Sequence, residues 1–333
     1  MSKRVLVTGG TGFLGQKLVH RLHEEGYEVT ALGRDQRIGS ELQQKGIRFV
    51  QCDIRDKEAM VEACRNQDVV HHVAAFSSLW GTFRDMYATN VDGTSHIIAG
   101  CMKYGIERLV HVSTPSIYFA FDDREGIQEN DPLPKRFANT YAHTKYLAEC
   151  KVEEAFQAGL GVITIRPRAL FGPGDNTILP RLIRANEKKF VPLIGGGRAV
   201  MDLTYIENVV DAQLLCMDSP ASTLGQAYNI TNGEPVTLID VLSEVFRRLE
   251  MPLRAKELPY WQAYSAAWVL ETLSRTLLGN REPVLTRYSV GVLAKSQTLD
   301  ITKACEALGY SPRVSITEGI EAFTQWWRLQ HER

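Results

Sequence analysis

Residues 3–15 read KRVLVTGGTGFLG and decide the fold of the chain. Val5, Leu6 and Val7 form a short apolar run rich in β-branched residues, which is typical of a strand buried on both faces. A turn with four glycines follows, and then the apolar residues of 16–25 recur at helical spacing. The order of strand, glycine-rich turn and helix predicts a parallel α/β domain whose first turn approaches a ligand.

The three glycines spaced as Gly9-x-x-Gly12-x-x-Gly15 are typical of a dinucleotide-binding turn. Gly9 permits the tight turn, Gly12 lets the backbone approach a pyrophosphate, and Gly15 lets the helix pack closely on the strand. The helix N-terminus offers free N–H groups and a partial positive charge to the phosphates. We place Phe13 and Leu14 in the same cofactor site. The alternative is an ordinary glycine-rich turn.

Length, charge and cysteine content limit the classes of protein to which the chain can belong. The chain has 333 residues and a formal net charge of −1, so its length predicts a core domain with a smaller lobe, and its charge gives no reason to expect a nucleic-acid partner. The six cysteines are scattered, without a CxxC pair or a Cys/His cluster, so we predict neither a disulfide framework nor a metal site. We expect a cytoplasmic protein with reduced thiols and no signal peptide.

The second predicted strand, residues 27–32, ends in Gly33 and Arg34. An acidic residue at that point would hold the ribose 2′-hydroxyl of NAD, whereas a guanidinium favours a 2′-phosphate. We therefore predict NADP as the cofactor, with NAD still possible. The alternative is that Arg34 is a solvated loop residue beside Asp35.

Two further pairs of residues follow predicted strands and are assigned to the cofactor. Asp53 can accept a hydrogen bond from the adenine amino group while Ile54 packs on the ring; alternatively, Asp53 caps the next helix. Ala74 and Ala75 are small enough to let the backbone lie against the cofactor ribose. Strands and helices alternate throughout this half of the chain, which predicts a doubly wound parallel sheet, the Rossmann fold.

Tyr141 and Lys145 are four residues apart and share one face of a predicted helix. A lysine at this spacing lowers the pKa of the tyrosine by favouring the phenolate, and a hydroxyl group near the end of strand 109–113 can hold a substrate oxygen. Such a group can protonate a carbonyl oxygen while a nicotinamide delivers hydride to the carbon. The alternative is a packed tyrosine and a solvated lysine.

The chain resembles the extended short-chain dehydrogenase/reductase superfamily, which includes the NAD-dependent epimerases and dehydratases, and within it the 3β-hydroxysteroid dehydrogenase branch. The bacterial olefin-pathway 2-alkyl-3-oxoalkanoate reductases are especially similar. The segments that carry the resemblance are TGGTGFLG at 8–15, NVDGT at 90–94, STPSIY at 113–118, YAHTK at 141–145, RPRALFGPGD at 166–175 and LTRY at 285–288.

The resemblance implies the roles of the site residues. Tyr141 is then the catalytic acid/base, Lys145 its partner and Thr114 the hydroxyl group, with Ser113 and Ser116 as alternatives. It also implies a position near the nicotinamide for Pro167, and for Asn90 a role in supporting the active-site backbone or in a proton relay.

The resemblance further divides the chain into a nucleotide-binding domain, 1–167 with returning segments at about 201–232, and a mostly helical substrate lobe, 168–200 and 233–333. The apolar stretch 258–278 lies in this lobe, and we considered it as a core helix, as the wall of an acyl-chain site or as a shallow membrane contact. The candidate acyl-chain surface comprises Trp261, Tyr264, Trp268 and Leu273.

These observations predict an NADP(H)-dependent reductase of a 3-oxo group on an apolar small molecule, with a 2-alkyl-3-oxo fatty acid as the best single candidate. The alternatives are a 3β-hydroxysteroid or sterol-4α-carboxylate dehydrogenase, a nucleotide-sugar epimerase, and a catalytically inactive protein that senses NADP. We also expect a homodimer with at most peripheral membrane contact.

Overall fold

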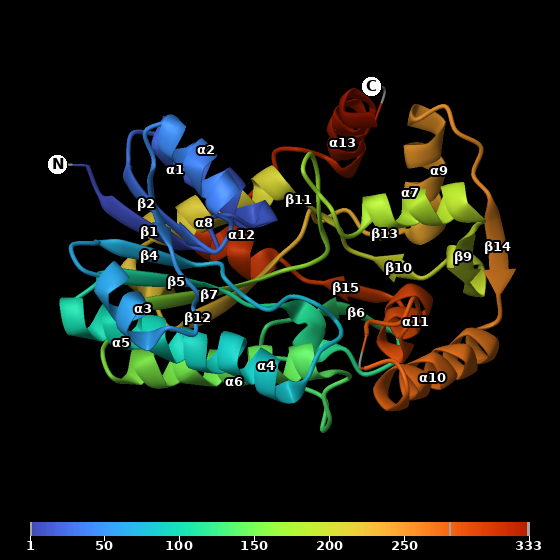
Figure 1. The fold of residues 1–333 in the computed structure, drawn as a ribbon, viewed down its shortest axis with the longest axis horizontal. Helices are drawn as coiled ribbons and strands as arrows, with labels where there is room; N and C mark the ends of the chain where they lie inside the picture. Colours follow the sequence, from blue (N-terminus) through green and yellow to red (C-terminus); the bar gives the residue numbers. More distant parts are fainter. Residues whose placement is uncertain (1, 280, 332–333) are drawn as a thin grey trace.

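A seven-stranded sheet forms the centre of the computed structural model, which describes residues 2–279 and 281–331 (Figure 1). Its strand order is β12-β7-β5-β4-β1-β2-β3, and all six pairings are parallel. The strands are β1 (Arg4–Thr8), β2 (Glu28–Gly33), β3 (Arg48–Gln51), β4 (Val69–His72), β5 (Arg108–Val112), β7 (Val162–Pro167) and β12 (Gln226–Ile230). The predicted doubly wound sheet is confirmed.

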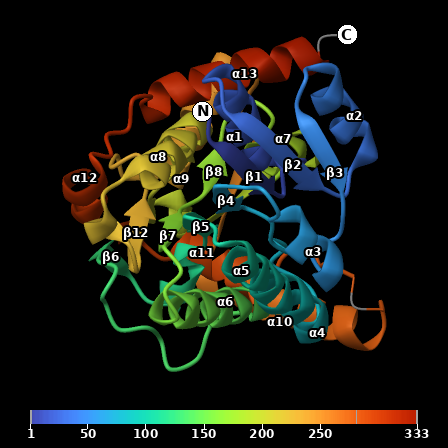
Figure 2. The ribbon, with the colours of Figure 1, turned by 90° about the vertical axis from the view of Figure 1, so that its left-hand side faces the viewer.

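Each face of the sheet buries its own core. In β1, Val5 and Val7 pack in one hydrophobic cluster, whereas Leu6 between them packs in another, as the alternation of side chains along a strand requires. Figure 2 shows the two helical layers that cover these faces. On one side lie α1 (Phe13–Glu24), α2 (Gln36–Gln44) and α8 (Ile206–Asp218); on the other lie α3 (Lys57–Ala63), α4 (Phe83–Tyr87), α5 (Gly93–Tyr104) and α6 (Thr140–Gln157).

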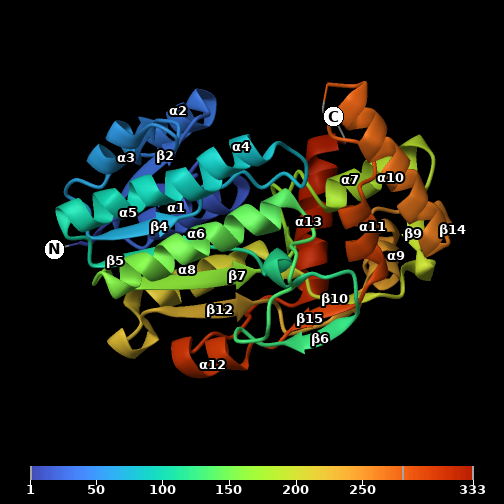
Figure 3. The same ribbon diagram turned by 90° about the horizontal axis from the view of Figure 1, so that it is seen from below.

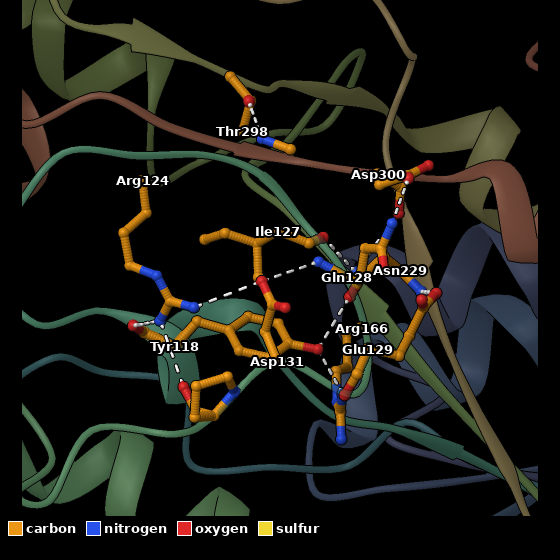
Figure 4. Close-up of polar contacts among 12 residues, drawn as sticks. Tyr118, Arg124, Ile127, Gln128, Glu129, Asp131, Arg166, Asn229, Thr298 and Asp300 are labelled. Carbon is orange, nitrogen blue, oxygen red and sulfur yellow. Dashed lines mark hydrogen bonds and ion pairs between the residues drawn. The ribbon is translucent and has the colours of Figure 1, made fainter.

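Short strands beyond the central sheet connect it to the remainder of the chain. One small sheet has the order β13-β10-β15-β6, and β8 pairs with β11. Their bounds are β6 (Arg124–Ile127), β8 (Leu170–Phe171), β10 (Val200–Met201), β11 (Thr204–Tyr205), β13 (Val236–Thr237) and β15 (Gln297–Leu299). The segment around β6 is hydrogen-bonded to β12 through Asn229, whose backbone N–H donates to Glu129 at 2.7 Å and whose side chain donates to the Ile127 carbonyl at 3.0 Å (Figure 4).

The far end of the molecule holds helices and one short strand pair (Figure 3). These elements are α7 (Leu179–Lys188), β9 (Val191–Ile194), α9 (Leu238–Arg248), β14 (Ala255–Leu258), α10 (Tyr260–Thr276) and α11 (Arg287–Ala294). The chain ends with α12 (Thr302–Leu308) and with α13 (Ile316–His331), which packs against α9. The exact division into two domains stays a prediction.

Helix α10 turns its small residues inward and its large apolar residues outward. Ala263 and Ala267 are buried in a cluster with Ile194 of β9, whereas Trp261 and Trp268 are 67% and 54% exposed. The small side chains allow α10 to lie close to its neighbours, so there is no room on that face for an indole. The interpretation as a core helix holds for this one face only, because the opposite face is exposed. Among the residues that the structure describes, no helix has the length and apolarity needed to span a membrane.

Candidate active site

A cavity of about 570 Å³ opens where the carboxyl ends of the central strands meet. This is the edge at which doubly wound sheets bind ligands. All the cofactor and catalytic residues predicted from the sequence line it: Gly9, Gly12, Phe13, Leu14, Gly15, Arg34, Asp53, Ile54, Ala74, Ala75, Thr114, Tyr141, Lys145 and Pro167. The structure thus brings together residues that are up to 158 positions apart, from Gly9 to Pro167.

The glycine turn packs closely on itself and on Ala74, and it leaves N–H donors at the start of α1. A Cβ on Gly9 would lie 2.9 Å from the backbone of Ala74, and one on Gly15 would lie 2.1 Å from the Gly9 carbonyl oxygen. Gly12 is the N-cap of α1, where no side chain caps the helix and no acidic residue occupies the first turn. The helix N-terminus therefore presents N–H groups and positive potential to the cavity, which fits the pyrophosphate of a dinucleotide.

At the end of β2, the side chain of Arg34 is 78% exposed and lies 3.9 Å from the Asp53 carboxylate. Hydrogen bonds from Arg55 to Asp53, at 2.9 and 2.8 Å, lower the pKa of that carboxyl to about 2. Asp56, not Asp53, caps α3 by accepting from the Ala59 N–H, so the capping alternative for Asp53 is wrong. The Arg34 guanidinium lies at the edge of the cavity.

Tyr141 and Thr114 form the centre of a chain of hydroxyl groups. The Thr114 side chain acts to lower the pKa of Tyr141, and the Thr114 hydroxyl donates to the Ser116 hydroxyl at 3.0 Å. Ser116 accepts a second hydrogen bond, 2.9 Å long, from the hydroxyl of Tyr288 at the start of α11. Sequence reasoning missed Tyr288, although it ends the LTRY segment that contributes to the family resemblance.

Burial dominates the protonation of the two central groups. It raises the pKa of Tyr141 to about 12, against a smaller opposite effect of the Thr114 hydrogen bond. It lowers the pKa of Lys145 to about 8, and the ammonium donates to the Val112 carbonyl at 2.8 Å. The causes of the Tyr141 shift are burial, Thr114 and Tyr288, so the expectation that Lys145 lowers the pKa of the tyrosine stays a prediction. With a pKa of about 12, Tyr141 is protonated at neutral pH.

Asn90 supports the cavity wall from a π-helical turn, Ala88–Asp92. Its side-chain oxygen accepts from the Phe76 N–H at 2.7 Å, and its amide donates to the Phe76 carbonyl and to the Thr144 hydroxyl. These bonds fix the segment after Ala75 against α6, next to Lys145. Of the two roles expected for Asn90, the contacts match the support of the backbone.

A loop that sequence reasoning did not assign closes another side of the cavity. The Asp175 carboxylate accepts hydrogen bonds from the backbone N–H groups of Thr177, Ile178 and Leu179 at 2.7–3.2 Å. Asn176, Thr177 and Ile178 line the cavity as a result. The GPGD turn was the available signal for this loop.

A second cavity, of about 180 Å³, lies between the residues that precede Tyr141 and the helices α10 and α11. Tyr264 lines it, as expected for a substrate surface, but Trp261, Trp268 and Leu273 do not. Those three side chains are exposed to solvent, so their prediction as the acyl-chain wall is wrong. The lining residues are Leu79, Trp80, Gly81, Phe121, Ala138, Asn139, Thr140, Tyr264, Glu271, Arg275, Thr286, Arg287 and Tyr288.

The family model of the 3-beta hydroxysteroid dehydrogenase/isomerase family matches residues 6–260. The chain belongs to this family. It is 35% identical to the 2-alkyl-3-oxoalkanoate reductase of Shewanella oneidensis, with 95% of this chain and 84% of that protein covered. It is 30% identical to the sterol-4-alpha-carboxylate 3-dehydrogenase (decarboxylating) of Mus musculus, with 97% and 91% covered.

A solved structure has the same fold. The UDP-glucuronic acid 4-epimerase from Bacillus cereus in complex with NAD aligns with a TM-score of 0.79 at 21% identity, and 98% of this chain and 99% of that chain are covered. The resemblance drawn from sequence motifs is confirmed by these matches. The chain is an NAD(P)-dependent oxidoreductase that acts on a hydroxyl or keto group.

Proposed function

We propose that this protein reduces the 3-oxo group of an apolar 2-alkyl-3-oxo carboxylic acid to a hydroxyl group, with NADPH as the hydride donor. The observation that carries the proposal is the position of Tyr141, Thr114 and Lys145 in one cavity with the glycine turn. The relative from Shewanella oneidensis bears the name of this activity.

Tyr141 and Thr114 line the same cavity, so a carbonyl oxygen placed beside them meets the Tyr141 hydroxyl, and it meets a second donor once the Thr114 hydroxyl rotates away from Ser116. Because burial raises its pKa to about 12, Tyr141 is protonated at neutral pH and can give its proton to that oxygen. The nicotinamide, when bound, supplies the hydride to the carbonyl carbon. The ketone thus gains one hydride and one proton and becomes the alcohol, and the Tyr141 oxygen recovers its proton from solvent.

Lys145 is suited to hold the cofactor and to support the tyrosine. An ammonium has three donors, and the contact with the Val112 carbonyl occupies one of them. The other two can reach ribose hydroxyl groups, since Lys145 and the glycine turn line the same cavity. During the reaction with bound cofactor, the positive charge of Lys145 can also stabilise a phenolate at Tyr141, because the two side chains lie on the same face of the helix.

The proposed function is tested with three substrates. NADPH oxidation is followed with a freshly prepared 2-alkyl-3-oxo acid and with a 3-oxosteroid, and epimerisation of UDP-glucose at C4 is followed with NAD, because UDP-glucose has no keto group that NADPH can reduce. We expect NADPH oxidation with the oxo acid alone, and slower oxidation of NADH. The Y141F protein supplies the background rate. Turnover of the steroid or the nucleotide sugar, with no turnover of the oxo acid, would reject the proposal.

Other expectations remain proposals of the same kind. These are the homodimer, the cytoplasmic location, the peripheral membrane contact and a substrate lobe built from 168–200 and 233–333. Sedimentation of the purified protein with and without lipid vesicles separates a monomer, a dimer and a membrane-associated form.

A further inference from the structure

The smaller cavity is a direct neighbour of the proposed reaction centre. Asn139 and Thr140, which line it, immediately precede Tyr141 in the chain. Tyr288 lines it as well, and the Ser116 hydroxyl accepts hydrogen bonds both from Tyr288 and from Thr114, which lines the larger cavity with Tyr141. The smaller cavity therefore lies beside the wall of the larger one that holds Tyr141.

The charges around this cavity do not cancel. Both Glu271 oxygens are engaged by Arg287, one with its backbone N–H at 2.7 Å and the other with its guanidinium at 2.8 Å. Arg275 lies one helical turn after Glu271, with its guanidinium 5.0 Å from the centre of the Trp80 ring. In the part of the chain that the structure describes, Arg275 has no carboxylate partner. The lining therefore carries one uncompensated positive charge.

Asn139 adds an unused donor. Its side-chain oxygen caps α6 by accepting from the Ala142 N–H at 2.8 Å. Its amide nitrogen is buried without a hydrogen-bond partner among residues 2–279 and 281–331. A buried donor without a partner costs free energy, and an anionic ligand in the cavity would satisfy it.

We propose that this cavity binds the carboxylate of the substrate through Arg275, with Asn139 as a second donor. The proposal rests on the function proposed above. In a 3-oxo acid the carboxylate carbon is two bonds from the keto carbon, so an enzyme for this class needs a cationic site beside its proton donor. The planar guanidinium can donate two parallel hydrogen bonds to a carboxylate, and its contact with Trp80 orients it for this purpose.

Matched substrates separate this role from a structural one. We would measure the NADP⁺-dependent oxidation of a 2-alkyl-3-hydroxy acid, which does not decarboxylate, and of its methyl ester. In R275Q we expect kcat/KM for the acid to fall about 10- to 100-fold, as for the loss of a hydrogen bond to a charged group. For the ester we expect a change of less than about threefold, and R275K should recover only part of the activity on the acid, because an ammonium keeps the charge but not the planar two-donor geometry.

Arg281 provides the control, since it is exposed and does not line the cavity. R281Q should leave both substrates unaffected. An equal loss on acid and ester in R275Q, or no loss on either, would overturn the carboxylate site. If the wild-type protein oxidises neither substrate, the proposed function itself fails.

A ligand test does not depend on any variant. A 2-alkyl carboxylic acid without the hydroxyl group should inhibit oxidation of the ester by the wild-type protein at least about tenfold more strongly than its primary amide, because only the acid carries the charge. Equal inhibition by the two compounds would contradict the proposal.

Discussion

The two cavities of this protein differ in how their walls are built. The larger one takes much of its lining from short contiguous segments such as 11–15, 33–35 and 52–54, each at or just after the end of a central strand. The smaller one combines 79–81, 138–140 and separate residues of α10 and α11. The shape of the larger cavity depends on the backbone at the ends of the central strands. The shape of the smaller cavity depends on how α10 and α11, which are far from residues 79–81 and 138–140 in the sequence, pack against those segments.

The difference predicts where substitutions act most strongly. The lining of the larger cavity lies on the ends of the central strands and on the helices that pack against them, so a substitution there should affect cofactor binding, catalysis or stability. The outer face of α10 contacts solvent, so changes there should be nearly silent. The following experiments test this contrast, in order of decreasing effect.

Y141F should reduce kcat by a factor of about 10² to 10⁴, the usual contribution of a general acid. The variant loses one hydroxyl group, so NADPH binding and the melting temperature should stay close to those of the wild type. Y146F is the control: Tyr146 is on the same helix but packs against Phe137, away from the cavity. Single-turnover kinetics that show a rapid Y141F reaction would place the acid elsewhere.

R166M should cost about 3–5 kcal/mol of stability, because it leaves a buried carboxylate without its partner. Arg166 and Glu149 join β7 to α6 through two hydrogen bonds, at 3.0 and 2.6 Å, and both side chains are largely buried. Urea unfolding measures the loss.

Two further variants sharpen this test. R247M removes an exposed pair with Glu244 and should hardly move the unfolding midpoint. A double variant with Leu at Glu149 and Met at Arg166 should regain much of the stability lost in R166M. If R247M and R166M lose equal stability, burial is not what makes the Arg166 pair important.

R34A should weaken NADPH binding about 10- to 100-fold and change NADH binding little, since only NADPH has a 2′-phosphate for the guanidinium. Isothermal titration with both cofactors measures this directly. R37A is a suitable control because Arg37 is paired with Glu41 and does not line the cavity. Equal affinity of the wild type for the two cofactors would remove the predicted preference.

Much of the larger cavity could be predicted because sequence order and spatial order coincide there. A glycine triplet after a buried strand is typical of a turn that approaches a dinucleotide. Because the strands are parallel, residues 113–114 lie at the same edge of the sheet as residues 8–9. The smaller cavity gave no such signal. Arg275 reaches it because α10 packs through Ala263 and Ala267, and apolarity alone suggested the opposite face. The direction of the Tyr141 pKa shift could not be predicted from the sequence either. The spacing to Lys145 suggested a lowered pKa, whereas burial, which only the structure reveals, raises it.

K145M tests the protonation of the larger cavity. The unfolded chain binds a proton at lysine up to a pKa of about 10.4. The folded chain releases that proton near pH 8, because burial lowers the pKa of Lys145. Between these values the unfolded state binds more protons, so stability rises with pH by up to about 1.4 kcal/mol per unit. The wild-type curve should show this rise relative to K145M, and parallel stability curves from pH 7 to about 10 would contradict it.

W268A should have the smallest effect, because the indole is half exposed on the outer face of α10. We expect a stability change within about 0.5 kcal/mol and unchanged kcat/KM for 3-oxo acids of every chain length. The neighbouring variant A267W is the contrast. Ala267 is fully buried against Ile194 and Val290, so an indole there overpacks the contact and should cost about 1–3 kcal/mol or more. If W268A instead selectively slows long-chain substrates, the outer face of α10 does bind the chain, and the contrast between the two regions fails.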